Sequence, residues 1–180
     1  MLNLVKNCTI NIKSLFLCTM MKIKYFLLFL CFVGCLSACK KGEIVEPYNP
    51  VPQFQADTTA IRSFVTLNAI PVQKFLTYGV YYQVIDPGVG TIDWKVSRKI
   101  TVDYTGKLLN GTTFDSSKGT PVLFYLDNLI IGWRVAIPKI QKGGKIRFFV
   151  PSYYGYGNVA TGPVPANSVL DFTVTLTDVQ

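Results

Sequence analysis

The sequence predicts an antiparallel α+β domain with several strands and one short central helix. Apolar and polar residues alternate at 100–105 and 170–177, which indicates strands that bury one face. A similar two-residue period occurs at 80–85, and turns rich in glycine and proline separate the segments. Strands and helices do not alternate in the order that produces a parallel sheet. The region spans about 100 residues, enough for a single core.

A helix is predicted at 57–68, ahead of the first strand. Asp57 is a suitable N-cap, and Ile61, Phe64 and Val65 recur with helical spacing. The apolar stripe that results is narrow. We expect it to pack on the domain, although a small contact surface for another chain would show the same pattern.

The strand expected at 78–85 is apolar on both faces, so another element should cover its second face. A later strand at 145–150 follows the Gly143-Gly144 turn. The last strand, at 170–177, should direct Phe172 and its alternate neighbours inward and Asp171 outward.

The stretch at 100–133 holds the candidate site. Asn110-Gly111 supplies a turn after its first strand. An aromatic residue and an acid, Phe114 and Asp115, follow the turn, and the stretch ends in an apolar cluster at 129–133. After Trp133 a brief helical turn is expected, which Pro138 should end. This order predicts an aromatic-lined site with one acid at its edge.

Residue types exclude several kinds of chemistry. The chain has no histidine, which excludes Ser-His-Asp catalysis, Cys-His catalysis and histidine metal sites. All five cysteines lie in the first 39 positions, so the remainder has neither a disulfide framework nor a catalytic thiol.

The first 38 residues are interpreted as a signal peptide. An apolar stretch at 25–38 follows basic residues and is shorter than the ~20 residues that a membrane-spanning helix needs. The sequence Leu-Ser-Ala-Cys at 36–39 resembles a bacterial lipoprotein processing site, so Cys39 is expected to be lipidated; an ordinary signal with a chance cysteine is the alternative. Translation is suggested to start at Met21.

Residues 39–56, which contain three prolines, are expected to form an extended tether. A lysine, Lys40, follows the cysteine where an acid would suggest inner-membrane retention, so we expect an envelope protein on the outer membrane. The first 39 residues hold four of the 18 basic residues and none of the ten acids, which leaves a formal charge of +4. No run of basic residues accompanies this charge, so nucleic-acid binding is not expected.

A set of motifs runs through the region in one order: 104–106, Gly111, 114–117, 130–133, 143–145, Pro151, 156–157, 164–165 and 170–172. In their order and spacing these motifs resemble FKBP-type peptidyl-prolyl cis-trans isomerases, over roughly 79–179. The resemblance implies a twisted antiparallel sheet wrapped around one short helix, within a domain at 78–180 that 57–77 connects to the tether. It implies isomerisation of X-Pro bonds in proline-containing polypeptides, without a metal or cofactor. We expect a monomer.

The resemblance also assigns residues. It implies a prolyl pocket whose members are Tyr104, Phe114, Trp133, Tyr156 and Phe172, with Asp115 at its edge. Leu129 and Ile130 would line the rim, the Ile130 backbone N–H would bind a substrate carbonyl, and Val164 would add apolar wall. Val122 stands where many members have a further aromatic residue, which puts affinity for large macrolides in doubt.

Each of these residues also has a plainer interpretation. Phe172 and Trp133 are of types usually found in a core, and Tyr104 fits an ordinary strand position. Asp115 would suit a cap for the turn that follows it. A catalytically weak binding or chaperone module with the same fold, and a structural lipoprotein with an accidental resemblance, are the alternative functions.

Overall fold

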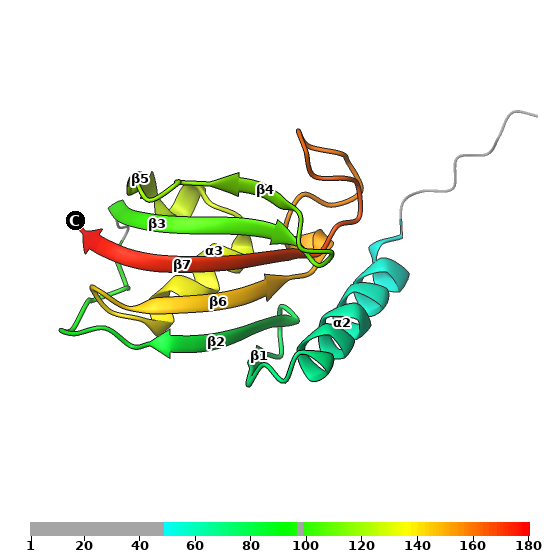
Figure 1. The fold of residues 1–180 in the computed structure, drawn as a ribbon, viewed down its shortest axis with the longest axis horizontal. Helices are drawn as coiled ribbons and strands as arrows, with labels where there is room; N and C mark the ends of the chain where they lie inside the picture. The colour runs from blue at the N-terminus through cyan, green and yellow to red at the C-terminus, as the bar shows by residue number, and fades with distance from the viewer. Residues whose placement is uncertain (1–48, 97–98) are drawn as a thin grey trace, which may run out of the picture. The chain divides into compact units, whose positions relative to one another are not determined.

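The computed structural model describes residues 49–96 and 99–180. Within these ranges a twisted antiparallel sheet lies against the short helix α3 (Ile131–Ala136), and a longer helix, α2 (Pro50–Leu67), precedes the sheet (Figure 1). The strands are β1 (Gln73–Phe75), β2 (Val80–Asp86), β3 (Lys99–Leu108), β4 (Thr113–Ser116), β5 (Val122–Tyr125), β6 (Lys145–Val150) and β7 (Leu170–Val179). The predicted α+β fold is confirmed.

The strands follow the order β1-β2-β6-β7-β3-β4, and β5 also pairs with β3. Every pairing is antiparallel. The long strands β3 and β7 lie side by side, with Gly106 opposite Phe172. Three short 3-10 turns complete the fold: η1 (Leu126–Asn128), η2 (Ile137–Lys139) and η3 (Ser152–Tyr154).

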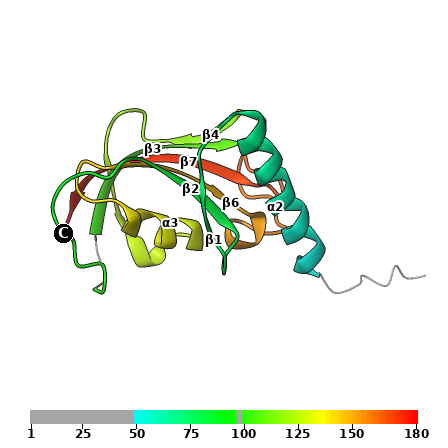
Figure 2. The same cartoon turned by 90° about the horizontal axis from the view of Figure 1, so that it is seen from below.

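The main core lies between the sheet and α3 (Figure 2). It contains Trp133 and Ala136 of α3 and four residues of β7 that are each at most 3% exposed: Leu170, Phe172, Val174 and Leu176. The helix ends at Ala136, and one 3-10 turn carries the chain through Pro138, as expected for a residue that lacks a backbone donor.

Helix α2 covers part of the opposite face of the sheet. Its Ile61 and Val65 pack with Tyr81 of β2 and Phe149 of β6, which are register partners. The second face of β2 was predicted to be covered by another element, and α2 provides that cover at Tyr81. Of the two interpretations of the apolar stripe, packing on the domain is confirmed.

The beginning of α2 differs from the prediction. The helix starts at Pro50, seven residues before the expected Asp57, so the helical segment includes the end of the expected tether. The side chain of Asn49 caps it by accepting a hydrogen bond from the Val51 N–H at 3.0 Å. Pro50 and Pro52 are tolerated because the first N–H groups of a helix have no intrahelical partner. Asp57 is therefore not a cap and lies inside the helix.

Asp171 was expected to face solvent, but only 5% of it is exposed. The Arg147 guanidinium donates to both carboxylate oxygens, at 2.9 and 2.7 Å, and lies over the Phe149 ring at 5.0 Å. The ring of Phe64 in α2 lies close to the same guanidinium, with 5.9 Å between the ring centroid and Arg147 Cζ. Asp171 does lie outside the main core, but it is paired with Arg147 and is buried.

Candidate functional site

Tyr104 and Asp115 form the polar part of the site. Tyr104 lies on β3 and Asp115 on β4, whose pairing places Asp115 opposite Gly106. The Tyr104 hydroxyl donates to Asp115 Oδ2 at 2.7 Å, and the Ser116 N–H donates to Oδ1 at 2.8 Å. One carboxylate oxygen therefore holds a site hydroxyl, while the other accepts the N–H of the next residue, Ser116, at the end of β4.

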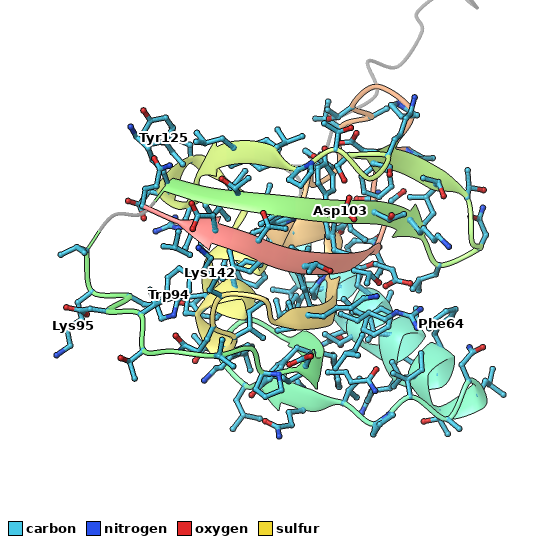
Figure 3. All side chains as sticks on the ribbon, turned by 60° about the vertical axis from the view of Figure 1, so that its left-hand side comes forward. Phe64, Trp94, Lys95, Asp103, Tyr125 and Lys142 are labelled. Atoms are coloured by element: carbon cyan, nitrogen blue, oxygen red, sulfur yellow. The ribbon has the colours of Figure 1, made fainter. Side chains whose placement is uncertain are left out.

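Ser117 fixes the backbone of Tyr104. Its hydroxyl accepts the Tyr104 N–H at 2.8 Å and donates to Asp103, and its N–H donates to the Tyr104 carbonyl at 3.1 Å. Asp103 lies on the other face of β3 from the core (Figure 3). The serine that ends the 114–117 motif thus ties the strand to the segment after β4, and this holds the Tyr104–Asp115 pair in register.

Trp133 is the centre of the aromatic cluster and is 4% exposed. Its ring meets Tyr104 at 5.5 Å and Phe172 at 5.3 Å between centroids, at interplanar angles of 78° and 73°. These are edge-to-face contacts, which the aromatic quadrupole favours. Trp133 is placed there by the first turn of α3.

Phe114 joins the cluster through Phe172, whose ring it meets edge-on at 5.5 Å. Gly106 makes this contact feasible. A Cβ at Gly106 would lie 2.6 Å from Phe114 Cζ and 2.9 Å from Phe172 Cε1, closer than carbon atoms approach. The glycine of the 104–106 motif is therefore required by the meeting of two rings.

Two members of the cluster were not predicted. Phe124 of β5 lies 5.8 Å from the Tyr104 ring and 6.1 Å from Trp133. Phe148 of β6 lies 5.8 Å from Trp133 and stacks on Phe172 at 5.4 Å. Phe148 belongs to the strand predicted at 145–150, whereas β5, which carries Phe124, was not among the predicted strands. The sequence contains no signal that singles them out from other core aromatics.

Tyr156 lies near this group without joining its ring contacts. It is 39% exposed and lies shortly after η3. Burial, and then the charge of Asp115, raise the pKa of the Tyr156 phenol. The hydrogen bonds of Asp115 within the described residues come from Tyr104 and Ser116, and Tyr156 donates none to it.

The phenol of Tyr104 stays protonated throughout the neutral range. Burial raises its pKa most, and the hydrogen bond to Asp115 and the carboxylate charge raise it further, to about 12. A neutral phenol held by a carboxylate is a fixed dipole. This part of the site can therefore orient a polar group without exchanging a proton at neutral pH.

The remaining predicted residues lie in different surroundings. Leu129 and Ile130 are half-buried and pack on the main core at the start of α3, while Val164 is buried in that core. Val122, on the short strand β5, is 37% exposed. The Ile130 N–H makes no backbone hydrogen bond within 49–96 and 99–180, so this donor is free to bind an added carbonyl group.

The described part of the chain contains no group of three Cys, Asp or Glu side chains placed to hold a metal ion. What the site offers is a group of apolar rings, a fixed Tyr104 phenol and a free backbone donor at Ile130. Such a set can bind an apolar ring beside an amide and remove water from it.

The family model for the FKBP-type peptidyl-prolyl cis-trans isomerase matches residues 90–177. A curated relative, FkpA of Escherichia coli (strain K12), is 40% identical over 109 residues, which are 59% of this chain and 40% of the relative. The Mip isomerase of Coxiella burnetii is 37% identical over 123 residues, 66% of this chain and 53% of the relative. The chain thus spans about half the length of these relatives, or less.

Solved structures agree with this match. The crystal structure of FkpA from Escherichia coli has a TM-score of 0.62 at 34% identity and covers 72% of this chain, with 62% of its own chain aligned. An isomerase from Pseudomonas syringae pv. tomato has a TM-score of 0.58 at 28% identity, over 74% of this chain and 98% of its own. With the motifs, the sheet and the aromatic cluster in place, these matches show that residues 90–177 form a domain of the FKBP-type peptidyl-prolyl cis-trans isomerase family.

Proposed function

We propose that this protein catalyses cis–trans isomerisation of X-Pro bonds in proline-containing polypeptides. The observation that carries the proposal is the cluster around Trp133, with the Tyr104–Asp115 pair beside it. It lies in the region that the isomerase family model matches. The cluster combines apolar rings with a few fixed polar groups, as small-ligand sites generally do.

The chemistry requires no nucleophile and no titrating group. Rotation about a peptide bond has a barrier of ~18–20 kcal/mol because the C–N bond has partial double-bond character. The planar amide is more charge-separated than the twisted one, so moving it from water to apolar rings favours the twisted state. Trp133 and Phe172 would supply that surrounding, which fits a chain that contains no histidine.

Polar groups at the edge would orient the substrate. The Ile130 N–H would bind a substrate carbonyl, and the Tyr156 hydroxyl would donate a second hydrogen bond. Asp115 would hold the Tyr104 phenol in place. Leu129, Val122 and Val164 would form apolar walls next to the proline ring. Holding the substrate in one twisted arrangement is the positioning part of catalysis.

An isomerisation assay on residues 40–180 with a short prolyl peptide tests this proposal. Uncatalysed exchange takes about 10–100 s, and we expect catalytic amounts of the protein to shorten it. The alternative, a binding module with negligible turnover, predicts that the peptide binds while its exchange time is unchanged. Peptide binding measured on the same preparation separates the two functions, and unchanged exchange would refute the isomerase.

We also propose that the domain is held in the cell envelope, on the outer membrane, by lipid attached to Cys39, and that it acts there as a monomer. Cys39 and the signal segment lie outside the described residues. Support comes from the processing-site sequence at 36–39 and from Lys40 after it. Within the described ranges no helix is long and apolar enough to cross a membrane.

Replacing Cys39 with alanine should abolish this anchoring. One acyl chain gives only marginal membrane binding, whereas two or more give stable attachment, as lipoprotein modification provides. We expect Cys39→Ala to remain unprocessed, or to become soluble if it is cleaved elsewhere. Fractionation of cells that express each form is the measurement. Recovery of the variant in membranes at mature size would show that Cys39 does not carry the anchor.

A further inference from the structure

Asp57 is an acid enclosed in the contact between α2 and the sheet domain, with 3% of it exposed. Burying a carboxylate is costly unless donors satisfy it. Three donors do so here: Gln53 Nε2 reaches Oδ1 at 2.6 Å, and the Ser152 N–H and hydroxyl reach Oδ2 at 2.7 and 2.6 Å. Two of these donors belong to one residue of the distant turn η3. The carboxylate therefore ties α2 to that turn.

Ser152 in turn holds the backbone on both sides of Tyr156. Its carbonyl accepts the Gly155 N–H at 2.9 Å and the Gly157 N–H at 2.8 Å. The Gly157 carbonyl then accepts the Asn167 N–H at 2.8 Å. Ser152 itself is fully buried, so its position is set by these bonds and by Asp57. A substitution at Asp57 would therefore reach Tyr156 through Ser152 and the two glycines that flank Tyr156.

An aromatic contact seats the same part of α2. Phe54, one turn before Asp57, meets the Tyr154 ring edge-on at 6.0 Å, and Tyr154 meets Tyr78 at 5.4 Å. Helix α2 therefore contacts η3 in two ways, through the Asp57 carboxylate and through the Phe54 ring. Tyr156 lies two residues after η3, and the charge of Asp115 contributes, after burial, to the raised pKa of its phenol.

We propose that Asp57 is a positioning residue for Tyr156: through Ser152, α2 holds the segment that carries the Tyr156 hydroxyl in place at the candidate site. This inference rests on the proposed isomerase function. It makes α2 part of the working site in addition to its role in packing. The group that touches substrate is Tyr156, and Asp57 acts only through it.

The test uses Asp57→Asn in the full chain, purified in detergent, alone and combined with Tyr156→Phe. The amide keeps the size of the acid but places an NH2 group against one of the donors. We expect kcat/KM to fall about fivefold, chiefly through a higher KM, and to fall less than about twofold when Tyr156→Phe is already present. Ile61→Val serves as the control, because it loosens the packing of α2 without touching Ser152 and should show no such coupling.

A spectroscopic measurement makes the test independent of turnover. In protein labelled at tyrosine Cζ, Asp57→Asn should move the Tyr156 resonance and leave that of Tyr125, on β5, in place. Equal losses of kcat/KM in both backgrounds, or an unmoved Tyr156 resonance in folded protein, would overturn the positioning role. Absence of activity in the unmodified chain would instead contradict the proposed function alone, and the Tyr156 resonance would then decide the role of Asp57. If Asp57→Asn does not fold, Ser152→Ala removes only the hydroxyl donor and takes its place.

Discussion

Trp133→Ala is expected to lower the free energy of unfolding by about 3–5 kcal/mol, the usual range for a buried aromatic truncated to alanine. The Trp133 ring is almost fully buried and contacts four other rings, those of Tyr104, Phe124, Phe148 and Phe172. The loss would be a large share of the ~5–15 kcal/mol by which native proteins are stable. Urea denaturation followed by circular dichroism measures it.

Trp94→Ala is the matched control for this prediction. Trp94 is the second of two tryptophans and is only partly buried at the edge of the main core. It makes no ring contact with the cluster in the described residues, so its truncation should cost clearly less. Equal losses for the two variants would contradict the central place given to Trp133.

In Trp94→Phe protein, a saturating prolyl ligand should also change the emission of Trp133, and unchanged emission would remove that ring from the site.

Asp115→Val should reduce kcat/KM roughly tenfold, or ~1.4 kcal/mol, the size of a hydrogen bond to a charged group. The substitution removes the acceptor of the Tyr104 hydroxyl. Because Asp115 is an exposed residue of β4, the valine does not have to fit into the core. The sheet should therefore stay folded while the substrate is placed less well. Steady-state kinetics and a melting curve on one preparation measure both effects.

A double-mutant cycle with Tyr104→Phe separates the two contacts of Asp115. If the loss arises through the Tyr104 hydroxyl, adding Asp115→Val to Tyr104→Phe should cost little more. If Asp115 only caps the turn at Ser116, the melting temperature should fall and kcat/KM should hold. Normal kcat/KM in folded Asp115→Val protein would remove the catalytic role assigned to Asp115.

Local patterns in the sequence were sufficient to predict most of the sheet. The strand expected at 145–150 is β6, and the alternation at 170–177 lies within β7. The two-residue period at 170–177 identifies the buried face of β7, and the Gly143-Gly144 turn marks the start of β6, so neither prediction needed information from distant parts of the chain. β1, with three residues and no alternation, gave no such signal and was missed.

Helix α2 shows where local patterns mislead. Pro50 and Pro52 lie in the stretch for which the sequence predicts a tether, although proline is compatible with the first turn of a helix. The sequence predicts a cap at Asp57 because an aspartate before an apolar stripe usually caps a helix. Its actual partner, Ser152, lies 95 residues away, and nothing near Asp57 in the sequence indicates that contact.

The candidate site was predicted through the family motifs more than through periodicity. The structure brings four predicted residues into one set of ring contacts: Tyr104, Phe114, Trp133 and Phe172. Tyr156 makes no such contact, but the charge of Asp115 contributes, after burial, to its raised pKa. Whether each residue acts on substrate stays a prediction. The partners that complete the cluster could not be identified because their role depends on how β5 and β6 meet α3.

Two-dimensional NMR exchange on an isotope-labelled Ala-Pro peptide, with catalytic amounts of the protein, tests the central claim most directly. We predict cis–trans exchange cross-peaks at mixing times of about a second or less, far shorter than the uncatalysed exchange time of ~10–100 s. With labelled protein, the same sample should show shifts at the Trp133 indole N–H and the Ile130 amide. Peptide that exchanges no faster with the protein than without it, or shifts confined to residues away from Trp133, would contradict the account.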